Sequence, residues 1–509
     1  MVYERVEVFH HRYANCHRAN GFVVVHCSPR ERGCTMRLFL INPTNPLVSC
    51  VTAKKNRWNR YRIWKPLSLL VLARQTPPEW EVTILDENLR SLDYATLPRP
   101  DLVGITAFTS QAPRAYEIAA FYRSLGVPVV MGGIHATMCL DEVLGQVDSV
   151  VTKEAENVWP QVLKDVQANK LQRHYDGGHV AVADFVPARQ DLLPEGYAFG
   201  TIQTTRGCPL NCSFCSVTTF NGAQYRQRPV DDVVREFASI PEKRVLVVDD
   251  NLVGTRPDHI ARAKDLFRAL AKAKLGKEWI AQATINFSDD EELMALAWKA
   301  GCRGVFIGFE SPTGDGLREL GKKFNLRDGR DFRASVRRIQ RHAILVMGSF
   351  IIGLDIDDTG IGKRVALAAK QYGVDSMNAL FLTPLPGTRL WDQMKREDRI
   401  TLDNFPADWR FYTLTLPVAR YQRLSFEAVM KEMADCNRTF YSMSGVMTRV
   451  WSCLLQWRKP LINLITNLST RTNSQVETRS YLDFQKHLAA RPARVAQPTL
   501  PCKDSVPAA

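Results

Sequence analysis

Residues 206–215 read Arg206-Gly207-Cys208-Pro209-Leu210-Asn211-Cys212-Ser213-Phe214-Cys215, which places three cysteines on one short stretch. Closely spaced cysteines of this kind bind the irons of a cubane cluster, one thiolate to each iron. The next cysteine in the chain is Cys302, so no nearby thiolate serves the fourth iron. The stretch therefore predicts a [4Fe-4S] cluster on Cys208, Cys212 and Cys215, with one iron open to a ligand from outside the protein. Such an open iron suggests catalysis rather than electron storage.

Two other kinds of site suit these cysteines less well. A structural zinc site would need a fourth cysteine or histidine at short range, and the stretch has none. A disulfide is disfavoured because close-set cysteines in a long chain without a secretory signal indicate metal or redox chemistry. The cluster remains the preferred interpretation.

The composition is that of a soluble globular protein, with 45% apolar and 24% charged residues among 509. This length suffices for two or three domains. The 12 cysteines are scattered too widely for a disulfide scaffold, and no window has the roughly 18 unbroken apolar residues of a membrane-spanning helix. The formal charge of +14 permits attraction to nucleic acid, anionic lipid or acidic substrates, and an arginine-rich proteome explains it as well. We expect a cytoplasmic protein in a reducing compartment.

The first part of the chain alternates short apolar runs with helical stretches. Residues 1–35 lack this periodicity and are predicted to form a disordered extension. Strands are predicted at 38–41, 81–86, 101–106, 127–131 and 147–151, and helices at 66–74 and 113–124. This order predicts a doubly wound parallel sheet, a Rossmann-like domain over residues 36–160. No G-x-G-x-x-G follows the first strand, which argues against a dinucleotide site.

Ligands of such sheets bind beyond the carboxyl ends of the strands. At those ends the chain carries Thr106-Ala107-Phe108-Thr109, Gly132-Gly133-Ile134-His135 and Glu154-Ala155-Glu156. Paired glycines let the backbone approach a ligand closely. His135 taken alone is more often a hydrogen-bonded structural residue than a ligand. Residues 161–199, which contain several glycines and prolines, are predicted to be a linker.

From residue 200 the alternation of strands and helices resumes. Six strands are predicted at 201–205, 244–248, 279–283, 304–309, 346–353 and 379–382, with helices at 258–273 and 289–300 among the intervening segments. Six such units predict a partial (β/α)6 barrel over residues 200–395, with its chemistry at the carboxyl ends of the strands. Polar residues collect at those ends: Asp249-Asp250-Asn251 and Glu310-Ser311, with Gln282 on a strand between them. Each would singly suit an ordinary turn, but together with the cysteine loop they indicate a site.

Residues 396–509 are predicted to be helical, with a disordered tail from about residue 491. Helical spacing covers 424–441 and 447–468. The second helix interleaves Trp451, Trp457 and several leucines with basic residues. It suits a membrane surface or a lid over an apolar substrate, but packing of its apolar face on the barrel is the preferred interpretation.

The cysteine stretch, with the aromatic Phe214 just before its last cysteine, resembles the signature of the radical S-adenosylmethionine (SAM) enzymes. In that family the open iron binds SAM, and one electron cleaves SAM to a 5′-deoxyadenosyl radical. The resemblance implies SAM contacts from residues on the barrel strands and on the cysteine loop. They are Phe214, Asp249, Asp250, Asn251, Gln282, Glu310, Ser311, Gly348 and Thr383.

The Gly132-Gly133-x-His135-Ala136-Thr137 spacing resembles the cobalamin-binding domain that precedes the barrel in one radical SAM branch. That branch usually has glycine where this chain has Lys153 and Ala155. The chain also lacks the D-x-H-x-x-G motif, so the resemblance implies cobalamin without a histidine ligand to cobalt. It implies cobalamin contacts from the carboxyl ends of the strands predicted at 101–106, 127–131 and 147–151. They are Thr106, Phe108, Thr109, Gly132, Gly133, His135, Glu154 and Glu156.

The resemblance covers about residues 36–395 and implies a cobalamin-dependent methyltransferase that acts on an unactivated carbon of a small-molecule or lipid-like substrate. It also implies an external one-electron reductant of the flavodoxin or ferredoxin type. A ring-forming or rearranging enzyme of the same branch is the first alternative. A non-catalytic iron–sulfur or nucleic-acid-binding protein is the second, although nucleic acid is not expected as a partner. Peripheral contact with a membrane stays open.

Overall fold

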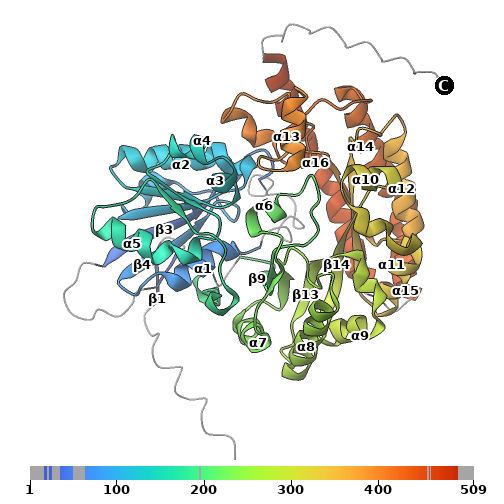
Figure 1. Cartoon of the computed structure of the whole chain (residues 1–509), viewed down its shortest axis with the longest axis horizontal. Helices are drawn as coiled ribbons and strands as arrows, with labels where there is room; N and C mark the ends of the chain where they lie inside the picture. The colour runs from blue at the N-terminus through green and yellow to red at the C-terminus, as the bar shows by residue number, and fades with distance from the viewer. Residues whose placement is uncertain are drawn as a thin grey trace, which may run out of the picture.

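The computed structural model describes residues 16–19, 22–25, 35–49, 64–193, 196–455, 458 and 460–490. These residues form two six-stranded parallel sheets, each covered by helices, that lie side by side (Figure 1). Within the extension that was expected to be disordered, β1 (Cys16–Ala19) and β2 (Phe22–Val25) pair antiparallel. The expected disordered tail from residue 491 lies outside the described residues.

The first sheet has the strand order β4-β3-β5-β6-β7-β8, and all of its pairs are parallel. Its strands are β3 (Met36–Asn42), β4 (Trp80–Asp86), β5 (Leu102–Thr106), β6 (Val129–Gly132), β7 (Ser149–Thr152) and β8 (His174–Asp176). The chain adds β4 on one side of β3 and all later strands on the other side. Parallel sheets bind ligands at such a switch point, which here lies between β3 and β5. The expected Rossmann-like architecture is confirmed.

The apolar run of β3 explains why both faces of this sheet are covered. Leu38 and Leu40 point to one face, and Phe39 and Ile41 point to the other. A strand buried on both faces reads as a continuous apolar run rather than an alternating one. Helices α1 (Leu67–Gln75) and α5 (Trp159–Gln167) cover the first face. The second is covered by α2 (Ala112–Ser124), α3 (Ile134–Met138) and α4 (Leu140–Leu144).

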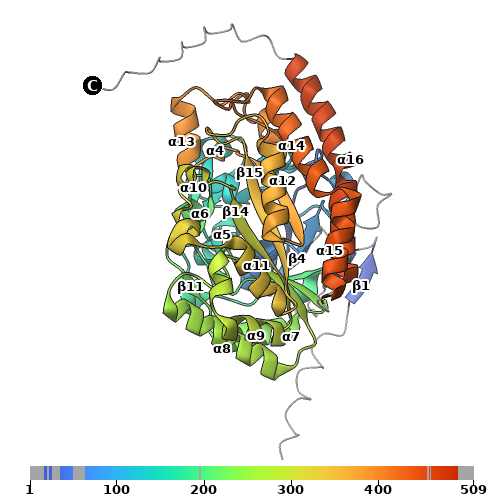
Figure 2. The same cartoon turned by 90° about the vertical axis from the view of Figure 1, so that its right-hand side faces the viewer.

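The second sheet has the order β16-β15-β14-β13-β12-β9 and is parallel throughout. Its strands are β9 (Gly200–Ile202), β12 (Arg244–Val247), β13 (Glu278–Ala283), β14 (Cys302–Glu310), β15 (Leu345–Ile352) and β16 (Ser376–Phe381). Helices α7 (Val230–Ser239), α8 (Pro257–Ala273), α9 (Glu291–Lys299), α11 (Phe332–Arg341) and α12 (Ile361–Tyr372) cover its outer side (Figures 1 and 2). The first and last strands do not pair, so the barrel is partial, as expected.

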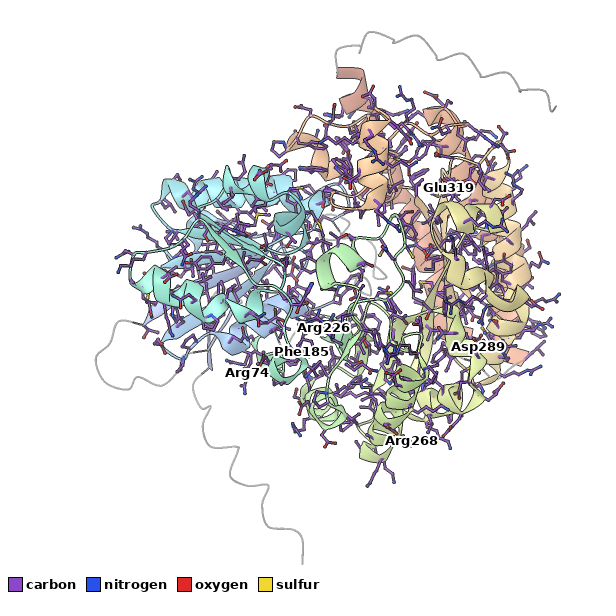
Figure 3. The ribbon with its side chains drawn as sticks, in the orientation of Figure 1. Arg74, Phe185, Arg226, Arg268, Asp289 and Glu319 are labelled. Carbon is purple, nitrogen blue, oxygen red and sulfur yellow. The ribbon has the colours of Figure 1, made fainter. Side chains whose placement is uncertain are left out.

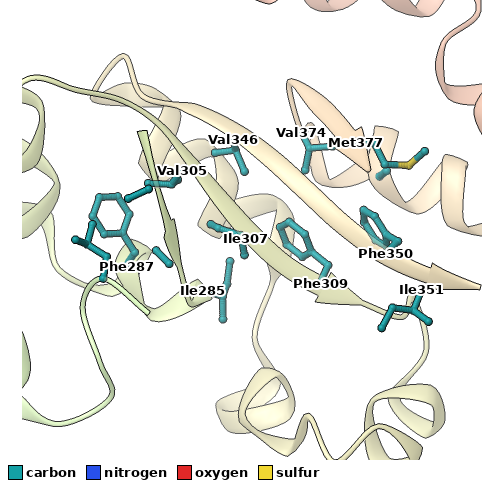
Figure 4. Packing of buried hydrophobic residues seen from close by; sticks show 14 of the residues in the cluster. Ile285, Phe287, Val305, Ile307, Phe309, Val346, Phe350, Ile351, Val374 and Met377 are labelled. Atoms are coloured by element: carbon teal, nitrogen blue, oxygen red, sulfur yellow. The ribbon is translucent and has the colours of Figure 1, made fainter. Parts of the chain in front are cut away.

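The barrel core lies between this sheet and its outer helices. Ile307, Phe309 and Phe350 are fully buried there, and the rings of Phe309 and Phe350 stack with centroids 5.6 Å apart (Figure 4). Burying each such side chain stabilises the fold by roughly 1.5–3 kcal/mol. On the opposite face of β13, Ile280 and Gln282 are exposed, so the inner side of the partial barrel is open.

The structure differs from the sequence prediction in two segments. The expected linker contains most of α5 and all of β8, which pairs with β7 at the edge of the first sheet. A three-residue edge strand is too short to show a period. The helix expected at 447–468 is instead two helices, α15 (Met443–Leu455) and α16 (Pro460–Ala490), because Pro460 suits the first turn of a new helix.

The C-terminal region contacts both sheets. Trp409, Phe411 and Phe484 are buried in the same cluster as α2 of the first domain. Helix α14 (Phe426–Phe440) packs along α12 on the barrel. The α15–α16 hairpin is fixed to the barrel at Asp375, which accepts hydrogen bonds from Asn463 Nδ2 at 3.1 Å and Arg458 Nη1 at 2.5 Å. Among the described residues, no helix is long and apolar enough to span a membrane.

Candidate functional site

The cysteine loop is closed at its base by a short antiparallel pair, β10 (Thr205–Arg206) and β11 (Arg226–Gln227). Between them lie the three cysteines and the short helix α6 (Val217–Asn221). Gly207 starts the loop at φ +84°, and a Cβ there would collide with the carbonyl oxygen of Gln224. Glycine is therefore required for the tight turn that brings the cysteines together.

The three cysteines are free thiols at the carboxyl end of β9. Cys212 is buried, and Cys208 and Cys215 are half-buried. Among the described residues, no three His, Cys, Asp or Glu side chains converge on one point to hold a single metal ion. A cubane takes one thiolate per iron, so its ligands need not converge on one atom. The donor set thus fits an iron–sulfur cluster better than one zinc ion.

A lysine that the sequence analysis did not single out lies beside these thiols. Lys322 follows α10 (Gly314–Glu319), and its Nζ lies 2.9 Å from Oε1 of Glu310. Burial opposes the charge of Lys322, but Glu310 and the cysteines outweigh burial and raise its pKa. Burial also raises the pKa of the thiols, that of Cys215 to about 12, and the ammonium group of Lys322 opposes this rise. No motif marked Lys322, because the fold alone brings it to the loop.

Two of the predicted SAM-binding carboxylates are already bonded within the protein. Asp249 is fully buried and accepts hydrogen bonds from Thr204 N at 2.5 Å and Thr204 Oγ1 at 2.6 Å. Burial raises the pKa of this carboxyl group. Asp250 accepts from Gly207 N and Asn221 Nδ2, both at 2.9 Å. In the structure both side chains therefore hold the cysteine loop on the end of β12.

Asn251 differs from its two neighbours. Its side chain is 1% exposed, and Oδ1 accepts a hydrogen bond from Thr284 Oγ1 at 3.3 Å. Its Nδ2 is buried without a partner among the described residues. A buried donor left unpaired is costly, so such an atom is a candidate for a ligand contact.

The other predicted SAM residues are spread over the barrel. Gln282 is exposed on the open inner face, and Phe214 packs against the barrel core. Ser311 is buried beside Glu310, which has φ +65°. Thr383 Oγ1 donates to a carbonyl oxygen of β16 at 3.0 Å. A Cβ at Gly348 would crowd two phenylalanine rings on the helix-covered side, so this glycine serves packing of the core rather than the open face.

A cavity of about 260 Å³ opens at the carboxyl ends of the first sheet. Leu40, Val130, Val151 and Trp159 form its apolar floor. Five of the predicted cobalamin residues line its mouth: Thr106, Gly132, Gly133, Glu154 and Glu156. The far wall belongs to the second domain. Arg206, Phe220 and Asn221 come from the cysteine loop and its base, and Gln203 and Val248 follow the ends of β9 and β12. An apolar cavity with a glycine-lined mouth and a charged rim fits a large amphipathic cofactor.

Backbone conformation shapes the mouth of this cavity. Gly133 has φ +91°, and a Cβ there would lie 2.7 Å from Oγ1 of Thr106. Lys153 has φ +59°, a backbone conformation that glycine adopts without strain. Its Nζ turns away to Asp176 at 2.8 Å, and Lys153 and Ala155 both line the cavity. The two departures from the usual glycines are thus accommodated without closing the cavity.

The remaining predicted cobalamin residues do not line the cavity. Phe108 lies beyond the carboxyl end of β5 and is 66% exposed, and the next residue, Thr109, is buried. His135 is fully buried, with Nε2 2.9 Å from the hydroxyl of Tyr116 and 3.3 Å from Glu142 Oε1. Its ring contacts Trp409 of the C-terminal region edge-on. In the structure His135 takes part in a hydrogen-bonded network that ties α3 to α2.

Buried ion pairs join the cavity to the cysteine loop. Figure 3 labels two of the side chains in this region, Phe185 and Arg226. Arg206 lies 3.0 Å from Glu154 and 2.5 Å from Glu156, and Arg226 Nη1 lies 2.9 Å from Glu154. Both guanidinium groups lie over the ring of Phe185. Burial favours a higher pKa for Glu154, but the two arginines outweigh it and lower that pKa. The carboxylates predicted to contact cobalamin are thus used to fasten the two domains together.

We expect Glu154→Ala to destabilise the protein strongly. The change removes the carboxylate that pairs with the buried Arg206 and Arg226. We expect this to lower the free energy of unfolding by roughly 3 kcal/mol. Glu117→Ala is the matched control, because it breaks an exposed pair with Arg114 and should cost less than about 1 kcal/mol. Urea denaturation measures both. Equal midpoints for the two variants would contradict the role given to Glu154.

Comparisons with known proteins agree with this geometry. Residues 202–359 match the Radical SAM superfamily, and residues 56–163 match the B12 binding domain. Bacteriochlorophyllide d C-12(1)-methyltransferase of Chlorobaculum tepidum is 29% identical over 80% of this chain and 89% of its own. Bacteriochlorophyllide d C-8(2)-methyltransferase of the same organism is 28% identical over 84% of this chain and 93% of its own.

A solved structure has the same fold. The radical S-adenosylmethionine methyltransferase TsrM from Kitasatospora setae, solved with cobalamin and a [4Fe-4S] cluster, superposes with a TM-score of 0.61 and 19% identity. The match covers 80% of this chain and 89% of TsrM. The two matched domains imply a [4Fe-4S] cluster, SAM and cobalamin as cofactors. The chain belongs to the cobalamin-dependent radical SAM enzymes, with a B12-binding domain followed by a radical SAM domain.

Proposed function

We propose that this enzyme transfers a methyl group from cobalamin to an unactivated carbon of a small-molecule or lipid-like substrate. The observation that carries the proposal is the shared wall between the two sites. Arg206 and α6 of the cysteine loop line the cavity of the B12-binding domain. A substrate carbon between them would lie within reach of both cofactors, which is the arrangement that methyl transfer to a substrate radical requires.

The chain's own residues divide the work. Cys208, Cys212 and Cys215 are proposed to hold the cluster, and Asp250 keeps their loop on the strand end through Gly207. Asn251 and Gln282 offer polar groups toward SAM at the inner face of the barrel. Glu310 and Lys322 keep a matched pair of charges near the cluster. When bound, the cluster supplies the electron that cleaves SAM, and cobalamin supplies the methyl group.

Anaerobic turnover tests this function. The reconstituted enzyme is supplied with cobalamin, a flavodoxin or ferredoxin type of reductant, and SAM with an isotopically labelled methyl group. We expect 5′-deoxyadenosine to form and cobalamin to acquire the label. Deoxyadenosine without any labelled cobalamin would favour the ring-forming or rearranging alternative. No deoxyadenosine at all would favour a non-catalytic iron–sulfur protein.

Asn251→Leu should weaken SAM binding. The leucine has a similar volume but removes the unpartnered Nδ2, so a SAM oxygen that uses this donor loses its hydrogen bond. We expect the Kd for SAM to rise roughly ten-fold or more. Equilibrium dialysis on the cluster-loaded protein measures the change. Asn286→Leu is the comparison, because Asn286 Nδ2 already donates to Gly254 O at 3.0 Å and should not contact SAM. Equal affinities in both variants would remove Asn251 from the site.

A further inference from the structure

The outward face of α15 gathers exposed apolar side chains. Six of the 13 exposed large hydrophobic residues that the structure describes lie on α15 and the first turn of α16. They are between 51% and 67% exposed and recur at helical spacing: Met443, Met447, Trp451, Leu454, Leu455 and Leu461. We call these six the α15 stripe. Exposed apolar residues that gather in this way mark a site of contact with another protein or a membrane.

The opposite side of α15 packs against the rest of the protein. Val446 and Cys453 are fully buried against the barrel. Arg449, which is the one charged residue of α15, turns inward, with Nη2 2.7 Å from Asn467 Oδ1 and its guanidinium 4.0 Å from the ring of Phe440. The outward face consequently carries no charged side chain. The hairpin is fixed by Asp375, so it cannot rotate to bury the stripe without breaking buried hydrogen bonds.

Two helices on the same side of the molecule as the stripe, α11 and α12, are basic (Figure 2). α11 and α12 contain no acidic residue, and their exposed positions carry Arg333, Arg337, Arg341, Lys363, Arg364 and Lys370. Helix α14 adds no net positive charge, because it carries Glu427, Glu432 and Asp435 beside Lys431 and Arg438. Arg364 of α12 pairs with Asp358. Figure 2 shows α11, α12, α14 and α15 on the same side of the molecule. The basic helices α11 and α12 thus lie on the same side of the molecule as an uncharged apolar stripe (Figure 2).

We propose that this side of the enzyme docks on an anionic membrane surface. The α15 stripe enters the boundary between headgroups and acyl chains, and the basic helices face the lipid phosphates. Amphipathic helices that lie in a bilayer interface bind through this combination of buried Trp and Leu side chains and attraction of Lys and Arg to anionic lipid. The proposal does not depend on the methyl-transfer reaction.

A second copy of the chain suits this surface less well. In a two-fold symmetric dimer each stripe would meet the other, which would bring the basic helices α11 and α12 of both copies to the same contact region. Like charges brought together in this way repel. In Figure 1, α15 lies on the far side of the barrel from α1, α5 and α6, which contribute residues to the cavity between the domains, so the stripe is not a lid over that cavity. An anionic surface complements the charges that a dimer would oppose.

Vesicle flotation tests the proposal with the full-length protein. The probes are vesicles of phosphatidylcholine alone and of equal parts phosphatidylcholine and phosphatidylglycerol. We expect the wild-type protein to float with the anionic vesicles and to be released by salt. The Trp451→Glu/Leu455→Glu variant should lose roughly ten-fold of the bound fraction. Arg337→Glu/Lys370→Glu should also reduce binding to anionic vesicles.

The matched control is Trp298→Glu/Leu125→Glu, which makes the same two substitutions at exposed positions outside the stripe. It should float like the wild type, and circular dichroism should verify that every variant is folded. Failure of the wild-type protein to float would overturn the proposal, as would equal losses in the stripe and control variants. A dimer in light scattering that the stripe variant converts to a monomer would also overturn it, in favour of self-association.

Discussion

Cys212→Ala is expected to remove the iron–sulfur cluster and, with it, SAM cleavage. Cys212 is the most buried of the three thiols, and with only two thiolates left the loop cannot hold a cubane. We expect deoxyadenosine formation to fall by roughly a thousand-fold or more, because the cluster supplies the electron that cleaves SAM. Iron content, the visible absorbance of the cluster and deoxyadenosine yield measure the effect after anaerobic reconstitution.

Cys302→Ala is the control for this prediction. Cys302 is the next cysteine in the chain, but it is fully buried in β14 within the barrel core. Its loss removes one sulfur from the core and should leave iron content and SAM cleavage near the wild-type level. Iron binding and turnover retained in Cys212→Ala, or lost equally in both variants, would contradict the assignment of the ligands.

Gly132→Leu is expected to abolish cobalamin binding while leaving the cluster in place. Gly132 lines the cavity at the end of β6, and its φ is not in the left-handed region, so a larger side chain is strained only by lack of space. A leucine would project into the cavity and fill the space that the cofactor needs. We expect cobalamin absorbance to disappear from the reconstituted protein while cluster absorbance and iron content persist.

Gly132→Ala is the matched control, because a Cβ at this position would meet Val151 O at 3.5 Å, an ordinary contact distance. This variant should retain cobalamin. Gly133 is unsuitable for the test, since any side chain there is strained by φ +91°. Simultaneous loss of cobalamin and cluster in Gly132→Leu would indicate unfolding, and retention of cobalamin would place the cofactor elsewhere.

The sequence predicted the parts of this protein that local patterns encode. The apolar runs of β3 and β14 and the helical stretches between strands predicted both sheets, because burial on both faces leaves a clear signature. The three-cysteine spacing predicted the cluster site, and the fold places these thiols on one loop at the carboxyl end of β9. The edge strand β8 was missed because three residues carry no period, and Pro460 was not recognised as the start of a second C-terminal helix.

The roles of individual polar residues were harder to predict. Asp249 and Glu154 stand at strand ends, where ligands bind, but the fold brings Thr204 and Arg226 to them, and those partners occupy the carboxylates. Lys322 reaches the cysteine loop from a segment more than a hundred residues away. Such pairings depend on tertiary contacts that no local pattern records. Asn251 keeps a buried Nδ2 without a partner among the described residues, and Gly132 lines the cavity, so both stay candidates for ligand contacts.

The central claim is a cubane held by three cysteines, with its fourth iron completed by SAM. Electron paramagnetic resonance of the reduced, anaerobically reconstituted protein, recorded before and after SAM is added, tests it most directly. We expect the signal of a reduced [4Fe-4S] cluster whose line shape changes when SAM binds the open iron. A spectrum that SAM leaves unchanged, or a protein that binds zinc at these thiols and no iron, would contradict it.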